Sequence, residues 1–259
     1  RRHTRYIGDW SSDVCSSDLP TSSFSFEDYF ALHAWQSDLY KPWQLITHMF
    51  LHGDFGHILG NMFALWMFGS ILENLWGPKR FLLFYMLCGL GAAVIHLAIL
   101  SYQLVPFANE YQQLLLLSKI HSPAFSDAVF NFSTKHHIPL TQILADNKVN
   151  LSTPGIAPSL MELITSYYTK MVDTATLGAS GAVFGILIAF VYLFPNTYIY
   201  IYFLFPIKAK WLGILYFGFE LYKGIENSAG DNVARWAHVG GAVIGFILVY
   251  IWKKKDITY

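Results

Sequence analysis

Long apolar runs constrain the fold of this chain more than any other feature. A helix needs about 20 apolar residues to cross the hydrocarbon core of a bilayer. Inside that core each span must pair its own backbone N–H and C=O groups, which favours helices. The sequence therefore predicts four clear transmembrane helices, at 58–76 (ILGNMFALWMFGSILENLW), 81–101 (FLLFYMLCGLGAAVIHLAILS), 177–194 (LGASGAVFGILIAFVYLF) and 234–252 (ARWAHVGGAVIGFILVYIW).

A fifth, weaker span lies between the last two. The region 198–225 divides at FPIKAK: YIYIYFLF before it suits the membrane interface, and WLGILYFGFELYKGI after it is a short span that carries Glu220 and Lys223. With 54% hydrophobic and only 13% charged residues, the chain is too apolar for an ordinary soluble domain. We therefore expect an all-α, polytopic transmembrane helix bundle with five spans.

Charge and cysteine usage exclude two other classes. The formal net charge is zero and the basic residues form no patch typical of nucleic-acid binding, so no nucleic-acid partner is expected. The two cysteines are Cys15 and Cys88, and Cys88 lies inside an apolar run. A structural disulfide framework is therefore not expected.

Outside the spans, the chain divides into three further parts. Residues 1–19 are polar, Ser/Asp-rich and aperiodic, which indicates a translated sequencing adapter or a disordered tail. Residues 20–56 are interpreted as a remnant followed by an external interfacial loop, PWQLITHMFLHGDFG. The membrane domain, 57–255, carries an insertion at about 102–174, in which NEYQQLLLLSKI and PSLMELITSYYTKMV are predicted amphipathic helices joined by loop-like STKHHIPLTQ and DNKVNLSTPGIAP.

The basic residues predict the orientation of the spans. If the spans alternate, seven of these residues fall on one side, which the positive-inside rule makes the cytoplasmic side. The insertion is then external, and the polar residues at the opposite ends of the spans lie near the outer leaflet. The seven basic residues are Lys79, Arg80, Lys208, Lys210, Lys253, Lys254 and Lys255.

Four polar residues share that outer depth: His57, Asn61, Ser180 and His238. Polar groups inside a membrane are costly and usually face the bundle interior or a water-filled cavity. Each also has a structural interpretation. His57 and Asn61, four residues apart on one helix face, can simply hydrogen-bond neighbours. His238 can be an interfacial residue beside Trp236, and Ser180 a small packing residue.

Glycine spacing links two of these polar residues. His238, Gly241 and Gly245 form one stripe of a helix at i, i+3 and i+7, and Gly181 and Gly185 form a small-xxx-small pair after Ser180. Such stripes let helices approach closely. If the two stripes face each other, the His238 imidazole comes within hydrogen-bonding reach of the Ser180 hydroxyl and can act as its general base.

Three motifs carry a family resemblance. HGDFGHILGN, GASG (Gly178 to Gly181) and AHVGGAVIG resemble the three signature motifs of the rhomboid intramembrane serine proteases, in their usual order along the chain. PWQLITHMFLHGDFG and ENLWG resemble the family's first external loop and the end of the following helix. The resemblance covers roughly residues 40–255, and the insertion is poorly matched. Three motifs in the right order are a specific signal.

The resemblance implies a role for each residue. Ser180 is the nucleophile and His238 the base that later protonates the leaving amine, a dyad that requires no aspartate. His57 and Asn61, with the Ser180 backbone N–H, are the oxyanion donors. His52 matches the first histidine of the family's HxxxxHxxxN pattern and is expected to support the external loop.

Two departures from the family pattern stand out. Phe184 occupies the position one turn below the serine where some members carry a tyrosine that stacks on the catalytic histidine; ring packing survives this change and a hydroxyl hydrogen bond does not. The family core has six spans, and the helix expected before the external loop is missing from this sequence. An N-terminally truncated copy of a prokaryotic-type gene is therefore expected.

The implied activity is hydrolysis of peptide bonds in or near the transmembrane helices of single-span membrane proteins, in the lipid bilayer. No cofactor and no metal are implied, because the histidines lack an HExxH-type arrangement. The expected location is a bacterial cytoplasmic (inner) membrane, with the site open to the external side. The alternatives are a rhomboid-like pseudoprotease or inactive truncated copy that binds membrane clients, a small transporter, and a purely structural membrane subunit.

Overall fold

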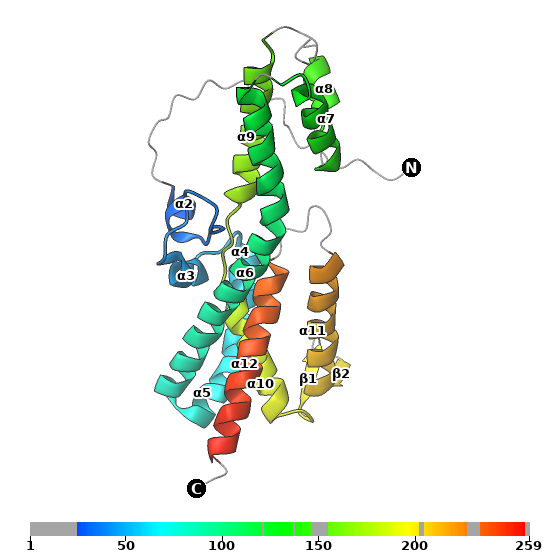
Figure 1. The fold of residues 1–259 in the computed structure, drawn as a ribbon. Helices are drawn as coiled ribbons and strands as arrows, with labels where there is room; N and C mark the ends of the chain where they lie inside the picture. Colours follow the sequence, from blue (N-terminus) through cyan, green and yellow to red (C-terminus); the bar gives the residue numbers. More distant parts are fainter. Residues whose placement is uncertain are drawn as a thin grey trace.

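A computed structural model describes residues 25–120, 122–136, 138–146, 155–201, 205–226 and 234–256. The described chain forms an elongated helical molecule, with a bundle at one end and a group of helices at the other (Figure 1). The segment 1–19, interpreted above as adapter-derived or disordered, lies outside the described residues.

Helices dominate the described residues. The short elements before the bundle are α2 (Phe26–Phe30), α3 (Gln44–Thr47) and the 3₁₀ helix η1 (His48–Phe50). The others are α4 (Phe55–Ala64), the π-helical η2 (Leu65–Gly69), α5 (Ser70–Trp76), α6 (Pro78–Lys119), α7 (Phe125–Lys135), α8 (Leu140–Asp146), α9 (Ala157–Val172), α10 (Ser180–Leu193), α11 (Ala209–Glu226), α12 (Arg235–Asp256) and the strands β1 (Tyr198–Ile201) and β2 (Phe205–Lys208).

Three described helical stretches are long and apolar enough to cross a membrane: Phe55–Trp76, Pro78–Lys119 and Arg235–Lys253. The other two predicted spans are present as helices that fall short of this standard. α10 is apolar but has 14 residues, because the helix begins only at Ser180. α11 has 18 residues but carries Lys210, Glu220, Lys223 and Glu226. The architecture is nevertheless an all-α polytopic bundle.

The small hairpin of β1 and β2 departs from the helical pattern of the described residues. The segment predicted to be interfacial contains β1, which pairs antiparallel with β2 in the register Tyr198 to Lys208 and Ile201 to Phe205. Alternating Tyr and Ile side chains suit a pleated strand better than a short helix.

The bundle is centred on α10, which packs against both α12 and α6, while α11 packs against α12 and α10. Its core combines aromatic and small side chains, and the small residues permit close helix approach. The buried members are Met49, Phe68, Leu72, Phe84, Cys88, Ala182, Ile186, Ala189, Phe190, Val191, Ala209 and Val249.

α6 is much longer than predicted. A span ending near residue 101 and a separate amphipathic helix were expected, but one 42-residue helix runs from Pro78 to Lys119, with Pro106 inside it. At 1.5 Å per residue the helix is about 63 Å long, roughly twice the thickness of the hydrocarbon core. Leu104 and Phe107, on either side of the proline, are buried. Packing around the proline therefore offsets the lost backbone hydrogen bond.

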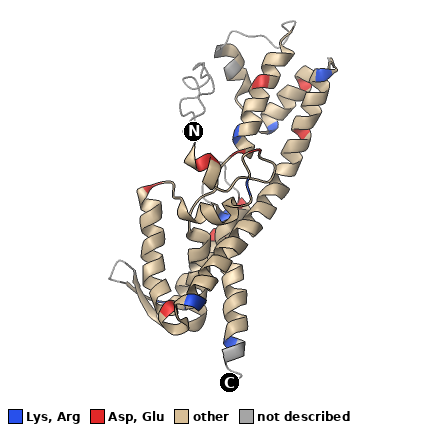
Figure 2. Ribbon diagram, turned by 90° about the vertical axis from the view of Figure 1, so that its left-hand side faces the viewer, with Lys and Arg blue, Asp and Glu red and all other residues tan. Residues whose placement is uncertain are grey.

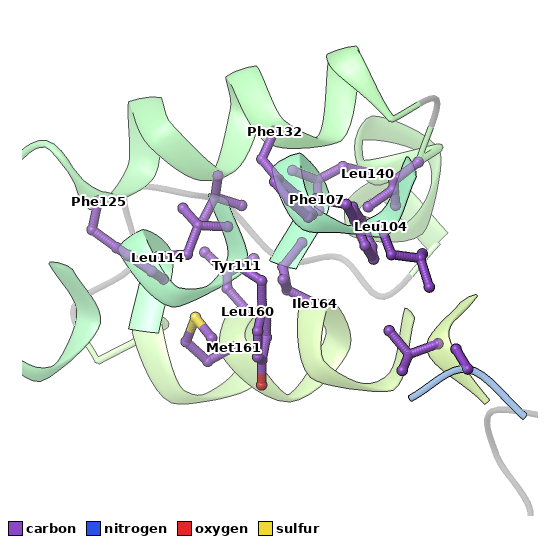
Figure 3. Close-up of a cluster of buried hydrophobic side chains, with 14 residues drawn as sticks. Leu104, Phe107, Tyr111, Leu114, Phe125, Phe132, Leu140, Leu160, Met161 and Ile164 are labelled. Carbon is purple, nitrogen blue, oxygen red and sulfur yellow. The ribbon is translucent and has the colours of Figure 1, made fainter. Parts of the chain in front are cut away.

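The part of α6 after residue 101 joins α7, α8 and α9 in what we call the helical extension. Tyr111 of α6 stacks on Tyr168 of α9 with ring centroids 4.0 Å apart. Figure 3 shows their shared hydrophobic core. Its buried residues are Ala34, Leu104, Phe107, Tyr111, Leu114, Phe125, Val129, Phe132, Ile138, Leu140, Leu160, Met161, Ile164 and Val172.

The sequence prediction for this insertion was incomplete. It recovered α9 but missed α7, and it assigned part of α8 to a loop. Phe125, Val129 and Phe132 of α7 recur at i, i+4 and i+7, which is a helical pattern. The end of α7 and the start of α8 both lie in the polar stretch STKHHIPLTQ, whose composition is typical of a loop.

Basic residues lie both in the helical extension and at the opposite end of the bundle (Figure 2). Arg80, at the start of α6, lies 4.5 Å from the ring centroid of Trp252, near the end of α12. Lys253 lies 4.9 Å from the ring centroid of Tyr192, at the end of α10. Both contacts place a basic residue near the ends of the bundle helices, and the orientation of the spans in the membrane stays a prediction.

Candidate active site

Ser180 and His238 meet in the described structure. Ser180 is the first residue of α10 and His238 lies in the first turn of α12. The Nε2 atom of His238 is 2.8 Å from the Oγ atom of Ser180, although 58 positions separate them in sequence. This distance is within the range expected for a nucleophile and its general base.

Two glycine stripes bring the helices together. A Cβ atom on Gly245 would lie 2.6 Å from the Cα of Gly185, and one on Gly241 would lie 2.6 Å from the carbonyl carbon of Gly181. Real Cβ atoms essentially never make contacts this short, so each glycine contacts backbone directly. The hydrogen bond between Ser180 and His238 depends on this close approach of α10 and α12.

Phe184 holds the plane of the His238 ring. The two rings are stacked with centroids 4.3 Å apart and an interplanar angle of 10°. On α11, Tyr216 lies 4.9 Å from the Phe184 ring centroid. Phe184 thus supplies the ring packing expected at this position.

Glu220 contacts His238, and the sequence analysis did not include it in the site. Its Oε2 atom is 2.9 Å from His238 Nδ1, and its Oε1 atom accepts a hydrogen bond from Arg235 Nη1 at 3.0 Å. Glu220 is only 2% exposed. An acidic residue within the apolar stretch WLGILYFGFELYKGI was the available signal, because ionisable residues in membrane segments usually have a function.

His57 packs beside the serine. Gly178 has a φ of +125°, a conformation that L side chains rarely adopt, and a Cβ atom there would lie 2.7 Å from His57 Nε2 and 3.7 Å from Ser180 Oγ. Gly178 therefore gives the His57 ring room beside the nucleophile. Asp54 caps α4 by accepting a hydrogen bond from the His57 backbone N–H at 2.8 Å, which fixes the first turn that carries the ring.

Asn61 lies one turn further along α4 and is buried. Its Nδ2 atom has no hydrogen-bond partner among the described residues. Buried donors are usually paired, and an unpaired buried donor one turn from His57 requires an explanation. A group that arrives during a reaction, such as a developing oxyanion, is one chemical partner that fits.

The external loop supports the backbone just before the serine. The His48 carbonyl accepts a hydrogen bond from the Gly178 N–H at 2.9 Å, and His48 Nδ1 lies 2.8 Å from the Gln44 carbonyl. Burial lowers the pKa of His48, which favours a neutral ring that donates from Nδ1. The His52 ring contacts the His57 ring edge to face, with centroids 5.1 Å apart.

A small cavity of about 10 Å³ adjoins the serine and is lined in part by His48, Thr176, Gly178 and Ser180. This volume is close to that of a single water site, and the lining supplies polar partners. Within the described part of the chain, no three His, Cys, Asp or Glu side chains gather as a metal ion would require.

The fold and this site define a polytopic helical membrane protein with an adjoining serine and histidine at the ends of two closely packed helices. The Rhomboid domain family matches residues 40–108 and 149–255. The chain therefore belongs to the rhomboid family. The unmatched residues 109–148 include the end of α6, α7 and α8.

Named relatives agree with this assignment. The chain is 27% identical over 203 residues to RHOMBOID-like protein 12, mitochondrial, of Arabidopsis thaliana, covering 78% of this chain and 44% of the relative. It is 25% identical to Rhomboid protein 1, mitochondrial, of Saccharomyces cerevisiae, covering 80% and 40%. Over 52 residues it is 36% identical to Rhomboid protease GluP of Bacillus subtilis, covering 20% and 10%.

The chain thus spans about half the length, or less, of these curated relatives. No solved structure matches it significantly. The family and the apolar helices make it an integral membrane protein. The relatives from Arabidopsis thaliana and Saccharomyces cerevisiae carry mitochondrial names, so they give no support to a bacterial inner membrane or to a prokaryotic type.

Proposed function

We propose that this protein is an intramembrane serine endopeptidase that uses Ser180 and His238. The observation that carries the proposal is the 2.8 Å separation of Ser180 Oγ and His238 Nε2 at the ends of two packed helices. The protease named among its relatives supports the same reaction class. A pair of groups at this distance can generate an alkoxide nucleophile without a metal or an organic cofactor.

The reaction proceeds in two halves. The Ser180 oxygen attacks the substrate carbonyl carbon while His238 Nε2 accepts the hydroxyl proton. The resulting oxyanion receives hydrogen bonds from the Asn61 amide, the His57 ring and the Ser180 backbone N–H. His238 then gives its proton to the leaving amine, and the Ser180 ester is hydrolysed by a water activated by the same imidazole. Removing one oxyanion donor typically costs about 10²–10³ in rate.

The proposed substrates are single-span membrane proteins whose helices unwind near one end. A peptide bond within a helix is protected because its carbonyl is hydrogen-bonded and screened, so local Gly, Pro or Ser residues would favour cleavage. The bacterial cytoplasmic membrane, with the site open to its external side, stays a prediction.

The test is cleavage of a transmembrane reporter by this protein in liposomes. Wild type should cleave it, whereas Ser180→Ala and His238→Ala should cleave no faster than empty liposomes. Equal cleavage by all three proteins, or none by wild type, would refute the proposal. Undiminished capture of the reporter by a non-cleaving wild type would instead indicate a client-binding pseudoprotease.

A further inference from the structure

We propose that Glu220 is the positioning residue for His238, so that the catalytic unit is a Ser–His–Glu triad rather than a dyad. This inference deepens the proposed function and rests on it. Three contacts in a line carry it: Ser180 Oγ to His238 Nε2 at 2.8 Å, His238 Nδ1 to Glu220 Oε2 at 2.9 Å, and Arg235 Nη1 to Glu220 Oε1 at 3.0 Å.

The carboxylate selects the tautomer of the histidine. An ionised carboxylate only accepts hydrogen bonds, so the contact with Glu220 places the imidazole proton on Nδ1. Nε2 then carries the lone pair, and it can accept the proton of Ser180. In the opposite tautomer Nε2 already carries a proton and cannot act as a base. The orientation and tautomer of His238 are therefore set before substrate arrives.

The negative charge of Glu220 also lowers the free energy needed to form an imidazolium at His238. When His238 accepts the Ser180 proton, a positive charge develops in a site where His238 is only 8% exposed. Opposite charges attract more strongly in such a low-dielectric site than in water. Arg235 balances the buried carboxylate in the resting state, which makes an ionised Glu220 tolerable in an apolar helix.

The other described titratable groups around His238 come from neighbouring helices. His96 of α6 interacts with it electrostatically, and Tyr216 of α11 packs on the Phe184 ring that stacks against it. Within the described residues no hydrogen bond joins either of them to the imidazole, which leaves Glu220 as the carboxylate placed to orient it.

A purely structural role for Glu220 is the competing interpretation, because its contacts also join α11 to α12. The decisive comparison uses Glu220→Gln and the control Glu226→Gln. The control makes the same chemical change six residues, or about 1.7 turns, further along α11, at an exposed residue paired with Lys223 at 2.6 Å. It lies outside the site.

We expect Glu220→Gln to lower kcat for reporter cleavage about 10²–10⁴-fold with KM nearly unchanged, the upper value being the cost of the corresponding change in the serine-protease template. Glu226→Gln should stay within about twofold of wild type, as expected for an exposed ion pair. Glu220→Asp keeps the charge on a shorter side chain and should restore part of kcat. ¹⁵N spectra of the histidine ring should show the His238 proton on Nδ1 in wild type and redistributed towards Nε2 in Glu220→Gln.

A second variant guards against misfolding. If Glu220→Gln does not fold, Glu220→Gln combined with Arg235→Gln removes both charged partners and should fold more readily. That folded double variant should still show the loss of kcat and the altered tautomer.

The possible failures can be told apart. If Ser180→Ala is inactive but Glu220→Gln has the wild-type kcat and tautomer, the triad is refuted and the proposed protease function stands. If kcat and KM both change while the tautomer stays on Nδ1, Glu220 is structural only. If wild type does not cleave, the proposed function fails, and a proton on Nε2 in that protein refutes the contact with Glu220 as well.

Discussion

Gly241→Ala should be the most informative packing change in this protein, because it adds one methyl group between α10 and α12. The new Cβ would lie 2.6 Å from the carbonyl carbon of Gly181 and closer still to its oxygen, whereas ordinary contacts begin at 3.4 Å. The obstacle is backbone and cannot rotate away. The two helices must therefore separate by at least about 0.8 Å, the difference between these distances.

This separation has two calculable effects. Overpacking of a tight interface costs about 1–3 kcal/mol, and the rigid obstacle places Gly241→Ala at the upper end of that range. If α12 moves away along the Ser180–His238 contact, the 2.8 Å distance becomes about 3.6 Å, beyond hydrogen-bond reach. A misplacement of about 1 Å can cost on the order of 10² in rate, so kcat should fall by that factor.

The measurement pairs a thermal melt in detergent with reporter cleavage in liposomes. Gly218→Ala on α11 is the matched control, because nothing lies within 4 Å of its added Cβ. It should melt at or slightly above the wild-type temperature, since alanine favours helix by about 1 kcal/mol over glycine. If Gly241→Ala retains both the wild-type melting temperature and kcat, the close packing of the two glycine stripes does not hold the site together.

Two further changes test the surroundings of the site. Phe184→Ala removes the ring stacked on His238. Because stacked aromatic pairs are worth about 0.5–1.5 kcal/mol, this change should lower kcat roughly 2- to 10-fold. Phe184→Tyr keeps the ring and should keep most activity, so equal kcat for both variants would contradict a positioning role for Phe184. Gln44→Leu removes the buried Nε2 donor that pairs with the carbonyls of Asp28 and Leu39. The free energy of unfolding should therefore fall by about 2–3 kcal/mol, and added protease should cleave the external loop faster. Gln112→Leu, at an exposed position on α6, should change neither, and an equal loss in both variants would contradict the prediction.

The sequence predicted the serine–histidine pair because both its signals are local. The spacing of Gly241 and Gly245 after His238, and of Gly181 and Gly185 after Ser180, marks two helix faces that can approach closely. A close approach of two such faces has few possible registers. The two glycine stripes therefore predicted a contact between residues that lie 58 positions apart in the sequence, without any knowledge of the fold.

Glu220 lacked a signal of that kind. Its partners lie on α12, and which residues of α11 face α12 depends on how the two helices pack. The length of α6 was hidden for a similar reason. From the local sequence alone, Pro106 predicts the end of a helix. The helix continues because Leu104 and Phe107 are buried in the helical extension.

The backbone that leads into Ser180 is held by hydrogen bonds to residues near the start of the described chain. At the end of α9, the Asp173 carboxylate accepts a hydrogen bond from the Ser37 hydroxyl at 2.6 Å. Three residues on, Thr176 exchanges two backbone hydrogen bonds of 2.8 Å with Leu32. The segment that contains Leu32 and Ser37 and the exit of the helical extension thus form one hydrogen-bonded unit directly before the nucleophile.

That unit and the glycine stripes constrain different degrees of freedom. The stripes set the distance between α10 and α12, while the hydrogen bonds at Thr176 and Gly178 set where α10 begins along its axis. A serine at the first position of a helix has no preceding helical turn to hold it. These hydrogen bonds replace that missing turn, and they explain why Leu32 and His48, far from Ser180 in sequence, belong to the architecture of its site.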